Sequence, residues 1–291
     1  MRIVVVGADG FVGANLADHL LRHTPHDLVT VGAGGRTHRI APSGRRRLVE
    51  VAEPTEHPLF ERCDAVVDLV GPVHGRDGGT GWAQEHRRAA HAARVIDRCT
   101  AAGAHLVRRV DAGRPLHAVD EDHPTTWVRT FDVVGPRLDR LDQGATAGAR
   151  VVAELIAALL TSRPMQLVDG GHQRRSPTHV ADACRAIVAL LVTGAPGPGP
   201  IDIGNPGNDT TIREVAVLLR DLWTELTGRT PAAGILDVTG GDDRAFGDHA
   251  RMLPDTSRLD ELGWAPRSDL ETTMRDTLAS YLRPTPLAVA G

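Results

Sequence analysis

Three glycines early in the sequence are spaced for binding a pyrophosphate. Gly7, Gly10 and Gly13 form a G-x-x-G-x-x-G turn between a short apolar run, typical of a buried strand, and a segment with apolar residues at helical spacing. The first glycine allows a tight bend, the second lets the backbone approach the phosphates, and the third lets helix and strand pack closely. The helix N-terminus adds free N–H groups and positive potential. The pattern predicts a dinucleotide site; a glycine turn that serves only packing is the alternative.

The adenosine ribose usually contacts an acid at the end of the second strand, and this sequence has none there. Residues 30–36 read TVGAGGR, and Arg39 follows shortly after Arg36. Either these two arginines hold a 2′-phosphate, which makes NADP the preferred cofactor, or they are solvated loop residues and cofactor binding is weakened or lost. The predicted contacts of the cofactor, NAD(P), are Gly7, Asp9, Gly10, Phe11, Val12, Gly13, Arg36, Arg39, Leu69 and Gly71.

Three further side chains are candidates for general acid or base chemistry. His74 follows the fourth predicted strand and Asp111 the fifth, on loops expected to edge the cofactor site, and Asp132 lies at the end of the sixth. A non-redox reaction such as elimination, isomerisation or cyclisation needs only a positioned base and a polarising group. Hydride exchange also remains open if Asp111 or His74 replaces a tyrosine. For any single histidine, a solvated or structural imidazole is the alternative.

The elements that must position these residues alternate between strand and helix. This order predicts an α/β fold, a Rossmann doubly wound parallel sheet with a small C-terminal substrate-binding subdomain. Right-handed crossovers would place the carboxyl ends of the strands along one edge, where a nucleotide binds. The predicted strands are 2–6, 28–31, 48–51, 63–70, 106–110, 127–134, 165–168 and 201–203, and the predicted helices are 11–21, 82–102, 147–160, 180–191, 212–226 and 269–282.

The domain organisation follows from the same order of elements. We expect residues 1–135, joined by about 176–203, to form the NAD(P)-binding domain. Residues 136–175 and 204–285 would form the substrate-binding subdomain, and 286–291 a tail.

Composition narrows the class of protein. With 41% hydrophobic and 24% charged residues among 291, the chain is typical of a soluble globular protein, expected in the cytoplasm. Its net charge of -4 gives no reason to expect nucleic acid as a partner, and no apolar run is long enough for a membrane span. Neither the three scattered cysteines nor any His, Asp and Glu spacing predicts a metal site. The sequence contains no lysine, so no step can use a lysine amine.

Four ordered blocks in the second half carry a family resemblance. Residues 128–139 resemble a segment in which R-P-F-N leads into G-P-R, with Thr130 and Asp132 in place of the Pro and Asn. The chain is similar to the extended short-chain dehydrogenases/reductases, or NAD-dependent epimerases/dehydratases, that modify nucleotide sugars, and most of all to the UDP-glucuronic acid decarboxylases. The other three blocks are 168–182, 202–212 and 251–266.

The resemblance implies an anionic small-molecule substrate and a set of arginines that bind it. Arginine suits this role because its planar fork donates two parallel hydrogen bonds to an oxyanion. The alternative for Arg150, Arg175 and Arg251 is a salt bridge to an aspartate such as Asp182, Asp242 or Asp255. A homodimer is the common assembly in such families, and it is in doubt here. The predicted substrate contacts are Arg137, Arg150, Arg175, His179 and Arg251.

The family's chemical machinery is missing from this sequence. The resemblance leads us to expect a Ser or Thr after the fifth strand and a Tyr-x-x-x-Lys pair on the next helix, where the phenolate exchanges the hydroxyl proton. Here Val110, Asp111 and Ala112 stand in place of the Ser or Thr, the only tyrosine is Tyr281, and that helix is predicted to be deleted. Two hypotheses follow: an atypical enzyme without the Tyr/Lys mechanism, or a non-catalytic regulatory or partner protein that binds NAD(P) or a nucleotide sugar.

Overall fold

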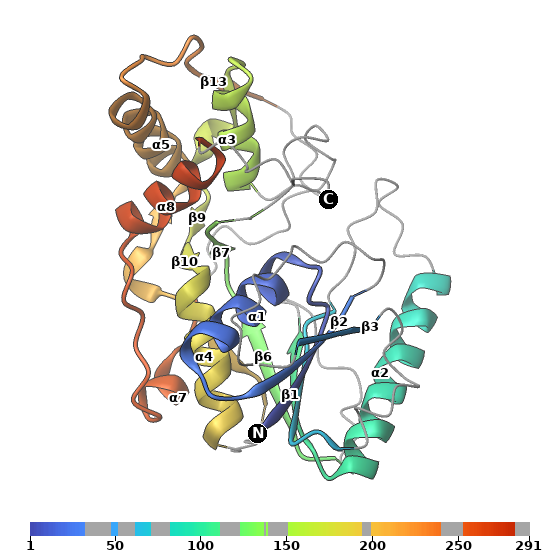
Figure 1. Cartoon of the computed structure of the whole chain (residues 1–291). Helices are drawn as coiled ribbons and strands as arrows, with labels where there is room; N and C mark the ends of the chain where they lie inside the picture. Colours follow the sequence, from blue (N-terminus) through green and yellow to red (C-terminus); the bar gives the residue numbers. More distant parts are fainter. Residues whose placement is uncertain are drawn as a thin grey trace, which may run out of the picture. The chain divides into compact units, whose positions relative to one another are not determined.

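The computed structural model of the chain divides into two compact units (Figure 1). The first unit comprises Met1–Phe131, Val180–Gly204 and Pro254–Pro266, and the second comprises Asp132–His179, Asn205–Leu253 and Arg267–Gly291. The residues that the structure describes are 1–32, 48–51, 62–70, 82–110, 123–136, 138, 151–193, 199–239 and 253–282.

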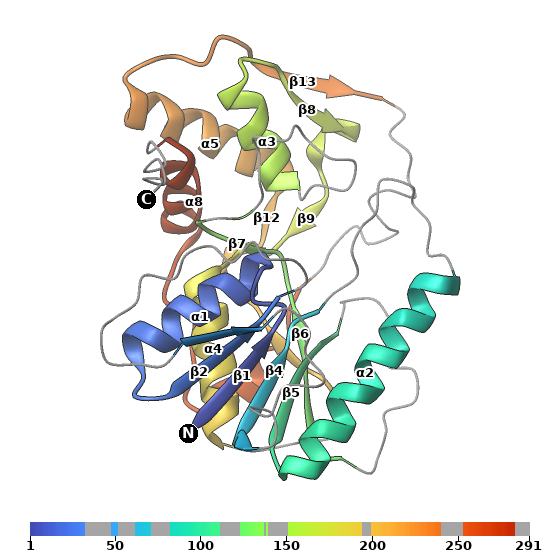
Figure 2. The same cartoon turned by 45° about the vertical axis from the view of Figure 1, so that its right-hand side comes forward.

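The first unit contains one sheet of seven parallel strands in the order β11-β6-β5-β4-β1-β2-β3 (Figure 2). The strand order runs outward in one direction from β1 through β2 and β3, and in the other through β4, β5 and β6. This reversal is the arrangement of a doubly wound dinucleotide-binding sheet, and it confirms the predicted fold class. The strands are β1 Arg2–Val6, β2 Asp27–Val31, β3 Leu48–Val51, β4 Ala65–Asp68, β5 His105–Val110, β6 Thr125–Thr130 and β11 Ile201–Ile203.

Helices cover both faces of this sheet (Figure 2). Helices α1 (Phe11–His23) and α4 (Val180–Thr193) pack against each other on one face, and α2 (Trp82–Ala102) packs on β4 and β5 on the other. Because both faces are covered, the central strands are apolar throughout, and β1 reads RIVVV with its last four residues buried. The core beneath α2 is formed by Val4, Val6, Val29, Val31, Cys63, Val66, Val95, Cys99, Ala104 and Leu106.

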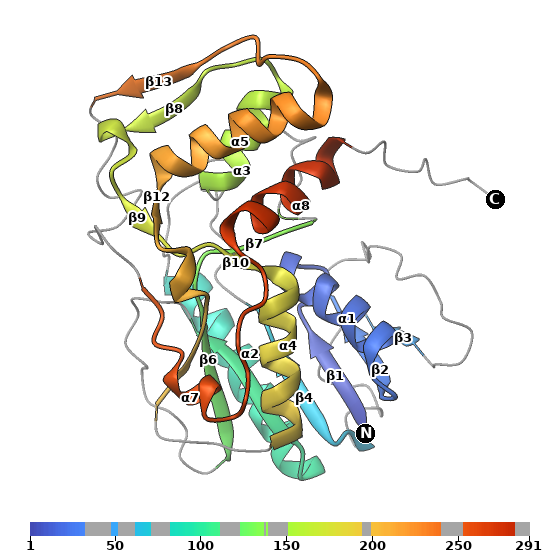
Figure 3. The same ribbon diagram turned by 90° about the vertical axis from the view of Figure 1, so that its left-hand side faces the viewer.

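Within the described residues, the second unit has three pairs of short strands and three helices. Helix α5 packs against both α3 and α8, and the strands β8 and β13 run alongside α5 (Figure 3). Its strand pairs are β7 Val133–Val134 with β10 Thr178–His179, β9 Arg174–Arg175 with β12 Thr210–Thr211, and β8 Met165–Val168 with β13 Ile235–Val238. Its helices are α3 Val151–Leu160, α5 Ile212–Thr227 and α8 Leu270–Leu282, with 3-10 turns at Asp169–Gly171 and Pro206–Asn208.

The structure differs from the sequence-based expectations at several points. The strand predicted at 127–134 is two strands, β6 and β7, because the backbone turns at Asp132, where φ is 40°. The strand predicted at 63–70 is limited to 65–68. Residues 254–266, expected with the substrate subdomain, group with the first unit, where the Asp255 amide donates to Asp202 at 3.1 Å and α7 (Ser257–Asp260) contacts β11.

None of the described helices is long and apolar enough to cross a membrane.

Candidate functional site

The glycine turn is fixed to the end of β2. The amides of Gly7 and Ala8 both donate to the Val31 carbonyl, at 2.9 and 3.1 Å, and the Gly10 amide donates to Gly7 at 3.0 Å. Gly7 has a φ of 81°, a conformation that a residue with a side chain rarely adopts. Helix α1 then begins with Gly10 as its N-cap, which provides no side-chain hydrogen bond to the first helical amides. The N-terminus of a helix is a common binding site for an anion.

The glycines allow the backbone to pack closely at this turn. A Cβ on Gly13 would lie 2.1 Å from the Gly7 carbonyl oxygen, so helix and turn can approach this closely only with glycine. A Cβ on Gly10 would lie 3.3 Å from the same oxygen. A Cβ on Gly7 would lie 3.3 Å from the backbone of Leu69, so Leu69 lies beside the turn. This glycine cradle, formed by Gly7, Gly10 and Gly13 before the N-terminus of α1, fits the pyrophosphate of a dinucleotide.

The remaining predicted cofactor contacts are only partly described. Asp9 lies over the end of β2, where its Cβ and Cγ are each 3.2 Å from the position that a Cβ on Gly32 would take. Phe11 and Val12 occupy the first turn of α1, and Val12 is buried. The predicted residues Arg36, Arg39, Gly71, His74 and Asp111 lie outside the described part of the chain.

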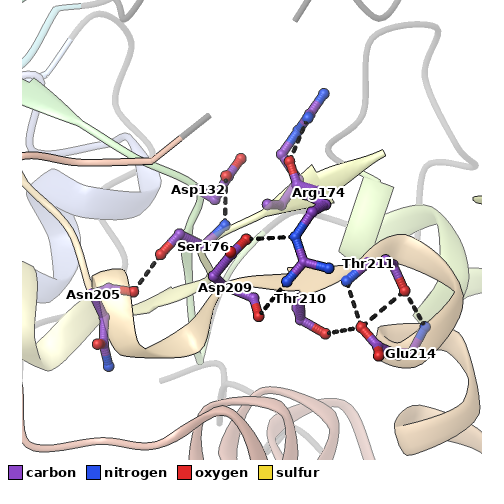
Figure 4. Close-up of polar contacts among 9 residues, drawn as sticks. Asp132, Arg174, Ser176, Asn205, Asp209, Thr210, Thr211 and Glu214 are labelled. Carbon is purple, nitrogen blue, oxygen red and sulfur yellow. Dashed lines mark hydrogen bonds and ion pairs between the residues drawn. The ribbon is translucent and has the colours of Figure 1, made fainter. Parts of the chain in front are cut away.

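Asp132 is the centre of a polar cluster in the second unit (Figure 4). Its carboxylate accepts a hydrogen bond from the Ser176 amide at 3.3 Å, and its carbonyl accepts one from the Thr178 amide at 3.1 Å. The Ser176 hydroxyl in turn donates to the carbonyl of Asn205. Burial raises the pKa of Asp132 above its usual value, although the Ser176 amide and the charge of Arg175 oppose this change. The result is a half-buried carboxyl group whose proton is held more tightly than usual.

The two neighbouring arginines of β9 have different roles. Arg174 is bound to Asp209 through its side chain at 3.0 Å and through the Asp209 carbonyl at 3.1 Å, which joins β9 to the start of β12 (Figure 4). Arg175 donates to the carbonyl of Arg174 at 2.8 Å, and its charge acts on Asp132. Arg174 thus connects the two strands, whereas Arg175 lies near enough to Asp132 for its charge to lower the pKa of that carboxyl group.

The other predicted substrate contacts do not gather at one point in the described residues. His179 is 7% exposed, and its Nε2 lies 3.5 Å from the Asp276 carboxylate of α8. Asp182, considered above as a partner for the arginines, pairs with Arg185 at 2.5 Å. The predicted contacts Arg137, Arg150 and Arg251 lie outside the described residues.

Sequence reasoning missed a buried charged network in the first unit. Arg108 donates to Asp68 from Nε at 3.0 Å and from Nη2 at 2.8 Å, and it also donates to the Ala92 carbonyl of α2 at 3.0 Å. His91 Nε2 lies 3.6 Å from the same carboxylate. Burial alone would raise the pKa of Asp68, but the contacts with His91 and Arg108 outweigh it and lower the pKa. The sequence did contain a signal for this network, since Asp68 and Arg108 are charged residues within otherwise buried strand segments.

Sequence comparison identifies relatives of the chain. The model of the NAD dependent epimerase/dehydratase family matches residues 3–113 and 114–204. The UDP-D-apiose/UDP-D-xylose synthase of Oryza sativa subsp. japonica is 30% identical over 161 residues, which cover 53% of this chain and 40% of that protein. Synthase 2 of the same kind from Arabidopsis thaliana is also 30% identical over 161 residues, covering 41% of its length. The matched region is thus less than half of each curated relative.

Solved structures share the fold over nearly the whole chain. The UDP-glucuronic acid 4-epimerase of Bacillus cereus, in complex with UDP-glucuronic acid and NAD, has a TM-score of 0.73 at 19% identity and covers 96% of this chain and 98% of its own. The UDP-N-acetylglucosamine 4-epimerase of Methanobrevibacter ruminantium, in complex with UDP-N-acetylmuramic acid, has a TM-score of 0.76 at 17% identity, with 97% and 98% covered. These structures support the Rossmann-like fold, and the family match confirms the sequence resemblance. The chain belongs to the NAD-dependent epimerase/dehydratase family, a family of nucleotide-sugar enzymes.

Proposed function

We propose that this chain is an atypical enzyme of its family that acts on a nucleotide sugar or another anionic metabolite without the Tyr/Lys mechanism. The glycine cradle of the first unit would hold the pyrophosphate of NAD(P), and the Arg175–Asp132 region of the second unit would hold an anionic or hydroxyl group of the substrate. The comparison proteins support this substrate class, since the Methanobrevibacter ruminantium enzyme is in complex with UDP-N-acetylmuramic acid and the Bacillus cereus enzyme with UDP-glucuronic acid and NAD. When bound, the nicotinamide would supply a hydride acceptor.

The spacing of two neighbouring strands supports the loss of the Tyr/Lys helix. Strands β5 and β6 are parallel and adjacent, with Arg108 opposite Trp127, and only residues 111–124 connect them. A parallel connection must return along the full length of the strand before the next one begins. A connection of this length in the sequence is short for a segment that must also carry the family's Tyr/Lys helix, which supports the proposal that this helix is absent. The sequence also contains no lysine, and its one tyrosine, Tyr281, belongs to α8 of the second unit.

The observation that carries the proposal is the position of Asp132, a partly buried carboxyl group at a left-handed backbone position. A carboxyl group with a raised pKa is closer to the range in which it can both take and give a proton near neutral pH. Its backbone has a left-handed φ of 40°, which costs free energy for a residue with a side chain and is often found at functional positions. Arg175 beside it could stabilise negative charge that develops on the substrate. These groups suit proton transfer in an elimination, isomerisation or cyclisation.

Solvent isotope exchange tests this role. The protein is incubated in D2O with NAD and, in separate samples, with UDP-glucuronic acid, UDP-glucose and UDP-N-acetylglucosamine, and the sugars are followed by NMR. Deuterium incorporation or a new product with the wild type, lost in Asp132→Asn, supports the proposal. The matched control is Asp237→Asn, an exposed carboxylate of the same unit that pairs with Arg213. Equal turnover by Asp132→Asn would contradict the assignment of Asp132.

A non-catalytic binding protein is the second candidate, because the missing Tyr and Lys favour it. This candidate predicts that calorimetry detects binding of NAD or a UDP-sugar while no sample shows exchange or product. The same samples therefore separate the two functions.

A further inference from the structure

The side chain of Asp9 lies next to Gly32, the residue that follows β2. Gly32 follows the last residue of that strand, Val31, and it has no side chain. The space where its Cβ would stand is bordered by Asp9, with Cβ and Cγ at 3.2 Å and Oδ1 at 3.5 Å. A side chain at Gly32 would therefore press against Asp9. The absence of a side chain at Gly32 thus leaves the space that the Asp9 side chain borders.

The end of β2 is the place from which Rossmann folds contact the adenosine ribose. An Asp or Glu about 20 residues beyond the glycine turn normally accepts hydrogen bonds from the ribose hydroxyls there. In this chain Gly32 stands at the end of β2, and no acid occurs in residues 30–36. Asp9 brings a carboxylate to this place from the glycine turn instead of from the strand. Its Oδ1 lies 3.5 Å from where the Cβ of an acid at position 32 would stand.

The turn holds Asp9 in place through the backbone. Two consecutive amides, those of Gly7 and Ala8, donate to the Val31 carbonyl, and the Gly10 amide closes the turn onto Gly7. Asp9 lies between these bonded residues, so its Cα is fixed relative to the end of β2. A carboxylate on such a rigid support loses little conformational entropy when it binds a ligand.

We propose that Asp9 replaces the missing strand acid, binds the adenosine ribose hydroxyls and selects NAD over NADP. This inference rests on the proposed dinucleotide site. The carboxylate accepts hydrogen bonds from a free 2′-hydroxyl, whereas a 2′-phosphate at the same place brings two negative charges together. The inference opposes the hypothesis that Arg36 and Arg39 make the site specific for NADP.

Binding measurements test the inference without any need for turnover. Dissociation constants of NADH and NADPH are measured by calorimetry for the wild type, Asp9→Asn and Asp27→Asn. The wild type should bind NADH at least about tenfold more tightly than NADPH. Asp9→Asn should weaken the binding of NADH by about tenfold, as expected for the loss of a hydrogen bond to a charged group. The ratio of the two dissociation constants should then approach one. Asp27→Asn, an exposed carboxylate at the opposite end of β2, should change neither constant.

An exchange variant separates a ribose contact from a structural role of Asp9. Asp9→Gly combined with Gly32→Asp moves the acid back to the strand end and removes the Cβ that a side chain at position 32 would meet. It should restore the preference for NADH, while Asp9→Gly alone should not. Thermal unfolding of each variant checks that it is folded.

The outcomes distinguish this inference from the proposed function. A wild type that prefers NADPH, or an Asp9→Asn variant with an unchanged ratio, overturns the role of Asp9 while the dinucleotide site stands. A wild type that binds neither cofactor at millimolar concentration overturns both.

Discussion

Asp68 and Arg108 form a buried ion pair between the adjacent central strands β4 and β5, with Arg108 Nη2 2.8 Å from Asp68 Oδ2. Both side chains are less than 10% exposed. Arg108 also reaches the Ala92 carbonyl of α2 and lies over the ring of Trp127 on β6, 5.8 Å from its centre. The pair therefore links three strands and a helix in a region that is otherwise apolar. Such a pair contributes little net stability when intact, but removing one partner leaves a buried charge.

Replacing one partner of this pair should be strongly destabilising. Arg108→Met keeps a long apolar side chain but leaves the Asp68 carboxylate without its guanidinium, so we expect the free energy of unfolding to fall by about 3–5 kcal/mol. The double variant Asp68→Leu/Arg108→Met removes both charges and should recover most of that loss. Urea unfolding monitored by circular dichroism measures both effects.

An exposed ion pair provides the control for this experiment. Arg275 of α8 pairs with Glu225 of α5 at 2.6 Å, and the Glu225 side chain is 59% exposed. Solvent screens such a pair, so Arg275→Met should change stability far less than Arg108→Met. A double variant at Asp68 and Arg108 that is no more stable than Arg108→Met alone would show that the destabilisation does not come from the unpaired charge.

The raised pKa of Asp132 predicts how its replacement changes stability with pH. Because burial raises the folded pKa above the unfolded value of about 3.9, the folded state holds this proton more tightly, and the contribution of Asp132 to stability falls as pH rises through that interval. Asp132→Asn has no titrating group at this position, so its stability does not fall in this way as the pH rises. The variant should match the wild type below about pH 4 and be the more stable of the two at pH 7. Unfolding free energies measured from pH 3 to pH 8 test this.

For Asp68 we expect the opposite dependence of stability on pH. Its folded pKa is lowered by His91 and Arg108 despite burial, so its stabilising contribution is present above the unfolded pKa and is lost as pH falls through the folded one. Asp68→Asn should therefore be less stable than the wild type at pH 7, with the difference shrinking in acid. If both variants changed with pH in the same direction, the assigned pKa direction of one carboxyl would be wrong.

The glycine turn predicts a separation between folding and ligand binding. A Cβ on Gly13 would lie 2.1 Å from a backbone oxygen, so Gly13→Ala should cost about 1–3 kcal/mol of stability and abolish dinucleotide binding. A Cβ on Gly10 has a milder contact of 3.3 Å, and Gly10→Ala should fold nearly as well while binding NADH poorly, because the methyl group occupies the phosphate approach. Calorimetry and thermal unfolding measure the two effects.

Gly234 is the matched control for these substitutions. A Cβ there meets nothing within 4 Å, so Gly234→Ala should change stability by no more than about 0.5 kcal/mol. Normal NADH binding by Gly10→Ala would contradict the placement of the pyrophosphate at this turn.

Local signals in the sequence were sufficient to predict much of the fold. Strands β1, β3, β8 and β11 and helix α2 have the bounds that their apolar patterns predicted. A buried strand of this kind can be recognised from a few consecutive residues, because a parallel sheet covered on both faces requires its strands to be apolar throughout. The start of α5 at residue 212 was likewise predicted, and in the structure Thr211 and Glu214 form a capping box there.

Features that depend on residues distant in sequence were not predictable. The backbone turn at Asp132 is held by Ser176 and Thr178, more than 40 residues away, so nothing in the segment 127–134 separates one strand from two. The pairing of Asp68 with Arg108 depends on the register of β4 and β5, which a single sequence does not provide. The position of Asp9 beside Gly32 is similarly a product of the fold, and the sequence predicted Asp9 only as one of several cofactor contacts.

The capping box of α5 allows a direct test of a predicted local structure. The Thr211 hydroxyl accepts a hydrogen bond from the Glu214 amide at 3.1 Å, and the Glu214 carboxylate accepts one from the Thr211 amide at 2.7 Å (Figure 4). Thr211→Ala should lower the free energy of unfolding by about 1 kcal/mol, whereas Thr211→Ser should retain most of the stability. Urea unfolding of the second unit's helices by circular dichroism provides the measurement.

The pH dependence of the same cap gives a second, independent measurement. The Thr211 amide and hydroxyl and the Thr210 hydroxyl lower the pKa of Glu214, so the contribution of this carboxylate is present above the unfolded pKa of about 4.3 and is lost as pH falls. Glu214→Gln can still accept the hydrogen bond from the Thr211 amide but does not titrate, so its difference from the wild type should shrink below pH 4. The double variant Thr211→Ala/Glu214→Ala should lose less than the sum of the single losses, because the two side chains stabilise one turn. Strict additivity would mean that the two halves of the box act independently and that α5 begins without the reciprocal pair.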